Sequence, residues 1–208
     1  MTLWERIART TVGADYAAAY ARRFEALAER GQDVHGEAAL VNALLAPPAS
    51  VLDAGCGTGR IAVRLHEQGY DVVGVDVDAT MLGEACAAAP HLEWLEGDLT
   101  TLELGRRFDL VLLAGNVIPL LEPETLRRVA QRLADHVLPG GAVVCGFGLD
   151  ADHLPGDCPV TPLASVDAAF ADAGLVAAER WSSWDREPFA DGGYVVTVHR
   201  PDPRGSSS

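Results

Sequence analysis

The chain has 208 residues, and 30 acidic against 16 basic residues give it a formal net charge of −14. That length can bury a continuous core within one domain. A surface this acidic disfavours nucleic-acid partners, because phosphate binding depends on clustered Lys and Arg. No apolar run has the length of a membrane span, and the N-terminus lacks a hydrophobic signal core, so we expect no membrane partner and a cytoplasmic protein. The four cysteines have no metal-type spacing and are expected to be reduced thiols, with no metal site.

The N-terminal part predicts two helices. Residues 14–29 place four large side chains on one helical face, namely Tyr16, Tyr20, Phe24 and Leu27. Gly31 is expected to end this helix, Gly36 to begin a second one, and Pro47 to end that one before the first strand. The polar tips of the tyrosines could turn toward a pocket, whereas packing on a sheet would also explain the apolar face.

A glycine-rich bend follows a buried strand at residues 51–59, which read VLDAGCGTG. Glycine has no Cβ, so this bend can adopt positive φ and let a ligand approach its backbone N–H groups at the start of the next helix. Asp53 lies just before the bend. The loop alone is compatible with several nucleotide-like ligands.

Two further strands end on an acid. DVVGVD (71–76) ends on Asp76, and HLEWLEGD (91–98) ends on Asp98. The β-branched run of the first is typical of a parallel strand covered on both faces. Consecutive βα units therefore bring Asp53, Asp76 and Asp98 to the carboxyl edge of one sheet, where open α/β sheets bind ligands.

The remaining segments complete an alternating pattern. FDLVLLAGNV (108–117) predicts a fourth strand, followed by a helix with Pro123 in its first turn and a buried stripe, made up of Leu126, Val129, Leu133 and Val137. Residues 150–162 form a polar loop with no familiar metal spacing. Thr161 is expected to cap a helix that has Pro162 at its first position and closes at Gly174, before two final strands.

In order along residues 49–149, the motifs VLDAGCGTGR, VGVDVDATML, EGDLT, FDLVLLAGNV and LPGGAVV resemble those of class I methyltransferases that use S-adenosylmethionine. The resemblance implies an α/β fold, with a Rossmann-like, doubly wound, seven-stranded sheet, mostly parallel with an antiparallel last strand and helices on both faces. It implies one methyltransferase domain over 1–208, with a helical lid at 1–48, a cofactor-binding core at 49–149, a C-terminal helix and hairpin at 150–200 and a disordered tail at 201–208.

The resemblance also implies S-adenosylmethionine as cofactor and a small-molecule acceptor, with the oligomeric state left open. Its candidate cofactor contacts are Asp53, Gly55, Cys56, Gly57, Gly59, Asp76, Val77, Met81, Asp98, Leu99, Ala114, Asn116, Tyr16 and Arg23. The candidate catalytic residues are His35 and His153, either of which could be the base for a hydroxyl acceptor, and Asn116, which could orient the acceptor.

Several roles have alternatives. Asp76 suits a ribose diol but could cap the helix near Ala79, for which Asp78 is the better candidate. Asp98 suits an adenine amine but could form an Asx-turn, and Asn116 could brace its own turn. A nicotinamide-dependent oxidoreductase is disfavoured because Arg60 stands where G-x-G-x-x-G needs its last glycine. A third functional class is a binding module that keeps the cofactor pocket but transfers no methyl group.

Overall fold

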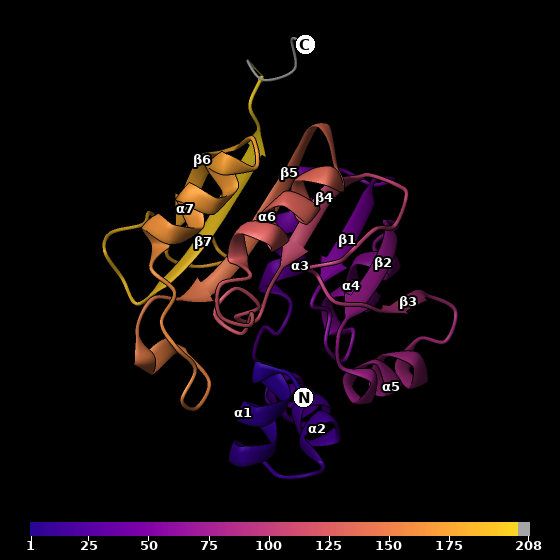
Figure 1. The fold of residues 1–208 in the computed structure, drawn as a ribbon. Coiled ribbons are helices and arrows are strands. Elements are labelled where there is room, and N and C mark those ends of the chain that lie inside the picture. The colour runs from indigo at the N-terminus through magenta and orange to yellow at the C-terminus, as the bar shows by residue number, and fades with distance from the viewer. Residues whose placement is uncertain (204–208) are drawn as a thin grey trace.

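The computed structural model describes residues 1–203 and is built around a seven-stranded sheet with the strand order β3-β2-β1-β4-β5-β7-β6 (Figure 1). Its strands are β1 Ser50–Ala54, β2 Asp71–Asp76, β3 Glu93–Glu96, β4 Phe108–Leu113, β5 Val137–Gly148, β6 Leu175–Trp181 and β7 Tyr194–Pro201. The residues of β1, VLDA, are almost fully excluded from solvent, as the sequence predicts for a central strand.

Strands β1 to β5 pair in parallel, and β7 pairs antiparallel with both β5 and β6. The chain builds β1, β2 and β3 outward in one direction and then returns to place β4 on the other side of β1. The carboxyl ends of β1 and β4 therefore flank the point where strand order reverses, which is where open α/β sheets bind ligands. The expected fold class is confirmed.

Helices cover both faces of the sheet. They are α3 Gly36–Leu44, α4 Arg60–Glu67, α5 Ala79–Ala88, α6 Leu126–Asp135 and α7 Leu163–Asp172, with a short 3-10 turn η1 at Ala151–His153. One buried cluster joins α6 and α7 to the sheet, and another joins α3 and α4 to it. Figure 1 shows α6 and α7 in front of the strands. These two buried clusters hold the helices against the sheet and so hold the ends of the strands in place.

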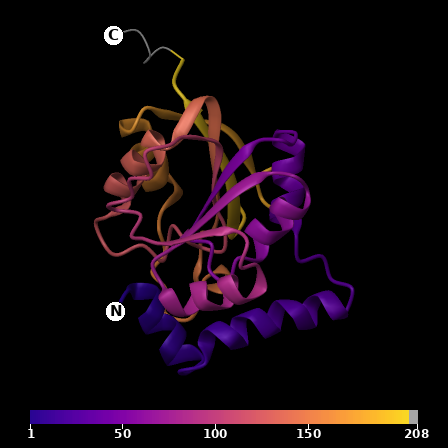
Figure 2. The same ribbon diagram turned by 90° about the vertical axis from the view of Figure 1, so that its right-hand side faces the viewer.

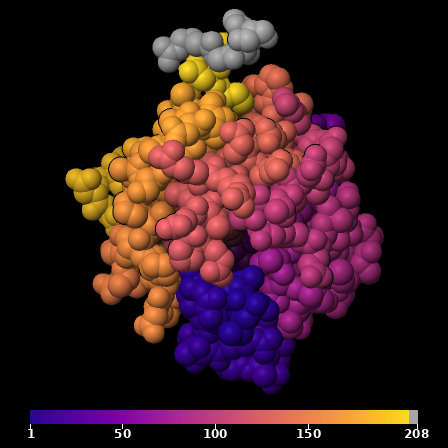
Figure 3. All heavy atoms as spheres, in the orientation of Figure 1, coloured from indigo at the N-terminus to yellow at the C-terminus, as the bar shows by residue number. Residues whose placement is uncertain are grey.

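Two more helices, α1 (Leu3–Thr11) and α2 (Tyr16–Glu29), lie across the carboxyl edge of the sheet (Figures 1 and 2). In the space-filling view their residues, in indigo, close the lower end of the molecule, and a narrow hollow separates them from the loops above (Figure 3). The sequence pattern predicts α2 but not α1. The missed signal is a capping box, because the Thr2 hydroxyl accepts the Glu5 N–H while the Glu5 carboxylate accepts the Thr2 N–H.

Some predicted boundaries are wrong. Helix α6 begins at Leu126, so Pro123 lies outside its first turn, and Val137 belongs to β5 because the helix ends before His136. Pro162 is the N-cap of α7, and the Thr161 side chain does not cap it. Pro201 extends β7, and residues 204–208 of the predicted tail lie outside the described residues.

Candidate functional site

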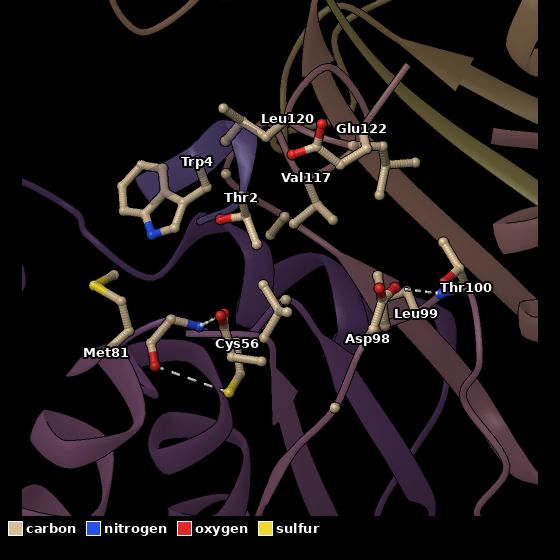
Figure 4. Close-up of a pocket in the computed structure, with 18 of the residues that line it drawn as sticks. Thr2, Trp4, Cys56, Met81, Asp98, Leu99, Thr100, Val117, Leu120 and Glu122 are labelled. Carbon is tan, nitrogen blue, oxygen red and sulfur yellow. Dashed lines mark hydrogen bonds between the residues drawn. The ribbon is translucent and has the colours of Figure 1, made fainter. Parts of the chain in front are cut away.

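A cavity of about 250 Å³ lies at the carboxyl edge of the sheet, between the ends of β1 and β4 and beneath α1 (Figure 4). Most of the residues predicted to contact a cofactor line it, and they are Gly55, Cys56, Gly57, Asp76, Val77, Met81, Asp98, Leu99 and Ala114. They come from the ends of four parallel strands and the start of α5. The cavity is therefore built by the strand ends that the sequence pattern brings together.

The glycine loop between β1 and α4 forms the floor of the cavity. Gly55, Gly57 and Gly59 all have positive φ, and the N–H groups of Gly55 and Cys56 donate to the carbonyl of Val75. A Cβ placed on Gly55 would lie 2.5 Å from Cγ2 of Val117, so this loop packs directly against the loop after β4. A side chain at Gly55 would push apart the two loops that form the cavity.

Gly59 has a packing role just outside the cavity lining. A Cβ there would overlap the Trp94 indole of β3, and its φ of +77° is strained for other residues. We expect Gly59→Ala to lower the free energy of unfolding by about 2–4 kcal/mol. Urea denaturation measures this. The matched control is Gly83→Ala, because Gly83 lies inside α5 with open space around it and should gain about 0.5–1 kcal/mol. Equal effects of the two substitutions would contradict the role of the indole contact.

Asp76 connects the glycine loop to the loop after β2. Its Oδ2 accepts the Gly57 N–H at 2.7 Å, and its Oδ1 accepts the Asp78 N–H at 2.9 Å. Burial raises its pKa, although the bonds from both backbone amides oppose that shift. Asp78, not Asp76, caps α5, since its Oδ1 accepts the N–H groups of Thr80 and Met81. A carboxylate has four acceptor positions, so Asp76 can still accept two further donors from the cavity.

The wall beyond Asp76 is mostly apolar. Leu99 and Val117 line it together with Val77, whose exposure of 40% is unusual for a large apolar side chain. Asp98 also lines the cavity, while its Oδ1 accepts the Thr100 N–H at 2.7 Å in the anticipated Asx-turn (Figure 4). The turn and a ligand contact are compatible, because the turn uses one acceptor position of the carboxylate.

Asp53 lies at the end of β1 below the cavity floor and is 1% exposed. Its Oδ2 has no hydrogen-bond partner among the described residues. Burial raises its pKa to about 7, and the nearby Arg60 guanidinium limits the rise. An unpartnered carboxylate in a buried position costs free energy unless a donor or cation completes it. Asp53 is not among the lining residues, so any interaction with a ligand would act through the loop or over a short distance.

Cys56 lines the cavity but has no activated thiol. Burial, followed by the charges of Asp53 and Asp76, raises the pKa of Cys56 well above the ordinary value for a thiol. A neutral thiol is a poor nucleophile, so the contribution of Cys56 is its backbone and its bulk.

The loop after β4 lines the cavity, but its asparagine is not among the lining residues. Ala114 and Gly115 line the cavity, but Asn116 does not. Asn116 has φ +68°, its Oδ1 accepts the Gly148 N–H at 2.7 Å, and its amide donates to the His153 carbonyl at 3.2 Å. The structure therefore supports the alternative in which Asn116 braces its turn.

Four other candidates lie outside the lining. Tyr16 is buried and donates to Asp78, and Arg23 is exposed on α2. His35 is the residue before α3, and burial together with Arg60 lowers its pKa. His153 pairs its Nδ1 with Asp150 at 2.7 Å in η1. The helical pattern identified the face of α2 but not which tyrosine reaches the cavity.

The residue of α2 that lines the cavity is Tyr20, one turn after Tyr16. Its hydroxyl lies 3.8 Å from a Cβ placed on Gly115, and burial raises its pKa, so it is a neutral phenol. Thr2, Trp4 and Glu122 also line the cavity, and no sequence motif predicted a role for them (Figure 4). Only the capping box at Thr2 gave a local sign that this segment is ordered.

Arg60 joins the glycine loop to the N-terminal helices. Its guanidinium forms a two-bond pair with Glu37 at 2.7 and 3.1 Å, donates to the Val34 carbonyl and lies 4.3 Å from the Phe24 ring centroid. Both partners of the ion pair are largely buried. Because Arg60 also lines the cavity, this pair fixes one end of the cavity to α2 and α3.

Over residues 1–203, no group of three or more His, Cys, Asp or Glu side chains is arranged to hold a metal ion. Within the same range, no helix combines the length and the hydropathy needed to cross a membrane.

Known proteins resemble this chain in both sequence and structure. Residues 51–141 match the family model of a methyltransferase domain. The dTDP-3-amino-3,6-dideoxy-α-D-glucopyranose N,N-dimethyltransferase of Streptomyces fradiae is 35% identical over 137 residues, which are 63% of this chain and 54% of that protein. The chain spans about half the length of the first curated relatives it matches.

Among solved structures, a TehB-like SAM-dependent methyltransferase from Corynebacterium glutamicum aligns with a TM-score of 0.80 and 31% identity, covering 89% of this chain and 98% of that one. DesVI of Streptomyces venezuelae aligns with a TM-score of 0.72 over 90% of this chain and 99% of that one, and at 22% identity it shows the fold alone. Identity above 30% over nearly the whole of a solved methyltransferase agrees with the motif order and with the cavity. This chain belongs to the class I S-adenosylmethionine-dependent methyltransferases.

Proposed function

We propose that this protein transfers the methyl group of S-adenosylmethionine to an amino group of a small molecule. The observation that carries the proposal is the cavity at the reversal of strand order, which joins the glycine loop, the carboxylates of Asp76 and Asp98 and an apolar wall. The curated relatives that support an amine acceptor are N,N-dimethyltransferases of dTDP-linked amino sugars.

The residues of the cavity fit this cofactor chemically. Asp76 would accept the ribose hydroxyls, and Asp98 would accept an adenine amine beside Val77, Leu99 and Val117. The amino-acid end carries a cation, which suits Asp53 near the floor, whose Oδ2 has no hydrogen-bond partner among the described residues. The nicotinamide alternative fits less well, because a pyrophosphate at the glycine loop would meet the charge of Asp53. When bound, the cofactor supplies a methyl group on a positively charged sulfur.

The cavity lining favours an acceptor that is already nucleophilic. No histidine lines the cavity in the part of the chain that the structure describes, and the Cys56 thiol is neutral. A hydroxyl acceptor would need a positioned base, whereas a neutral amine does not. The protein's contribution is then to hold the amine in line with the methyl group, to exclude water with Trp4, Leu120 and Val117, and to keep acidic side chains near the ammonium product.

Calorimetry and a turnover assay test this function. We expect S-adenosylhomocysteine to bind saturably and NAD not to bind, and we expect a labelled methyl donor to transfer its label to an amino sugar or a simple amine. The acceptor panel should pair each amine with its hydroxyl analogue. Binding of NAD alone would overturn the assignment. Binding of S-adenosylhomocysteine without turnover on any amine, or turnover only on hydroxyl compounds, would overturn the proposed acceptor class.

A further inference from the structure

We infer that Asp78 is a positioning residue that holds α1 and α2 closed over the cavity and links that closed position to the carboxylate of Asp76. Asp78 is 2% exposed. Its Oδ2 accepts the Tyr16 hydroxyl at 2.6 Å and the Trp4 indole N–H at 3.0 Å, while its Oδ1 caps α5. One side chain thus binds α1, α2 and α5 together.

The same residue continues the hydrogen bonds into the cavity. The Asp78 N–H donates to Oδ1 of Asp76, and Oδ2 of Asp76 accepts the Gly57 N–H. An unbroken chain of hydrogen bonds therefore runs from Tyr16 and Trp4 through Asp78 and Asp76 to the glycine loop. A ligand that orders Asp76 and the loop will stabilise the closed position of α1 and α2, and the reverse must also hold.

Helix α1 crosses the cavity between two carboxylates. At its N-terminal end the Leu3 N–H donates to Glu122 after β4, and Arg6 pairs with the same carboxylate at 3.5 Å. On the other side Trp4 reaches Asp78 after β2. Because Thr2 and Trp4 line the cavity between these anchors, α1 acts as its roof (Figure 4).

The two helices pack outside the main cores, so we expect them to open at a low free-energy cost. Their buried contacts form two small clusters, one around Met81 and one that joins Ile7 to Leu154 and Cys158, both separate from the two sheet cores. Gly31 follows α2 at φ +73° with open space around it, which suits a hinge. Segments with few buried contacts open at the lowest free-energy cost.

Tyr16→Phe is the sharpest test, because it removes one hydroxyl and leaves the cap of α5 intact. Burial and Asp78 raise the pKa of Tyr16, so the phenol is a neutral donor to a carboxylate. Such a bond predicts that S-adenosylhomocysteine dissociates about tenfold faster or more from the variant. Amide hydrogen exchange of the full chain without ligand should rise across residues 3–29. Trp4→Phe should act in the same direction and guards against a folding defect in the first variant.

Tyr70→Phe is the matched control. Tyr70 is equally buried, and its hydroxyl bonds to Asn42 and to the Leu45 carbonyl, away from α1 and α2. It should leave both the dissociation rate and exchange in residues 3–29 unchanged. If Tyr16→Phe and Trp4→Phe change exchange no more than Tyr70→Phe does, the inference is wrong.

The inference rests on the proposed function only for the link to cofactor. Should wild-type protein fail to bind S-adenosylhomocysteine, the proposed function fails, and the exchange measurement without ligand still decides whether Asp78 holds the helices closed. Faster exchange with an unchanged dissociation rate would overturn the link to the cavity.

Discussion

Asp76→Asn is expected to weaken the binding of S-adenosylhomocysteine at least 100-fold. In the proposed complex the carboxylate accepts both ribose hydroxyls, and each charge-assisted hydrogen bond contributes about 1.5–3 kcal/mol. The amide keeps the size of the side chain but turns one acceptor into a donor, which also faces the N–H of Gly57 or Asp78. Isothermal titration calorimetry measures the loss.

Glu96→Gln is the control, because Glu96 pairs in register with Asp76 on the neighbouring strand and is exposed. It should leave affinity within a factor of about two. An analogue that lacks the ribose 2′-hydroxyl separates a ligand contact from damage to the loop. If Asp76 binds the diol, the missing hydroxyl should weaken binding to wild type but have little further effect on Asp76→Asn. Equal losses in both proteins would show that Asp76 acts only through the loop.

The floor and the far wall of the cavity were predictable from the sequence because they depend on local patterns. Asp53 lies near the end of β1, Asp76 ends β2 and Asp98 follows β3, and parallel βα units place such strand ends at one edge. The glycines of the loop need positive φ, which the residue type itself reveals. The parallel arrangement of the strands then places these locally predicted residues at one site.

The roof of the cavity was not predictable because it depends on contacts between distant segments. Leu3 and Glu122 are 119 positions apart, and Trp4 and Asp78 are 74 apart. Tyr16 and Tyr20 share one helical face, and a single turn of about 5.4 Å decides which of them reaches the cavity. Periodicity identifies the face of a helix, whereas its shift along the axis is set by the tertiary packing against Met81 and Asp78.

The buried position of Asp53 predicts that cofactor binding depends on pH. The pKa of Asp53 is about 7 in the folded protein without ligand, so the carboxyl is mostly protonated below that pH. If the proposed contact forms, the cationic amine of S-adenosylhomocysteine favours the carboxylate and lowers this pKa in the complex. Affinity should therefore rise about tenfold per pH unit from pH 5.5 toward 7, with release of one proton. The amine of the ligand is that of a free amino acid and keeps its charge below pH 7.5, so a pH dependence in this range reports on the protein.

Asp53→Asn should remove this pH dependence and weaken binding at pH 7.5, yet stabilise the protein without ligand. A carboxyl whose pKa is raised by folding contributes stability below its unfolded value of 3.8, and that contribution is lost as the pH rises toward 7. At pH 8 the wild type carries this cost, on the order of 2–4 kcal/mol, and the amide does not.

Asp71→Asn is the control, because Asp71 begins β2 and so lies at the edge of the sheet away from the cavity. Calorimetry in buffers of different ionisation enthalpy counts the protons, and urea unfolding at pH 5.5 and 8 measures stability. A flat affinity profile in wild type would show that Asp53 carries no proton linked to the ligand, and the cationic end would then depend on the backbone of the glycine loop and the other lining residues.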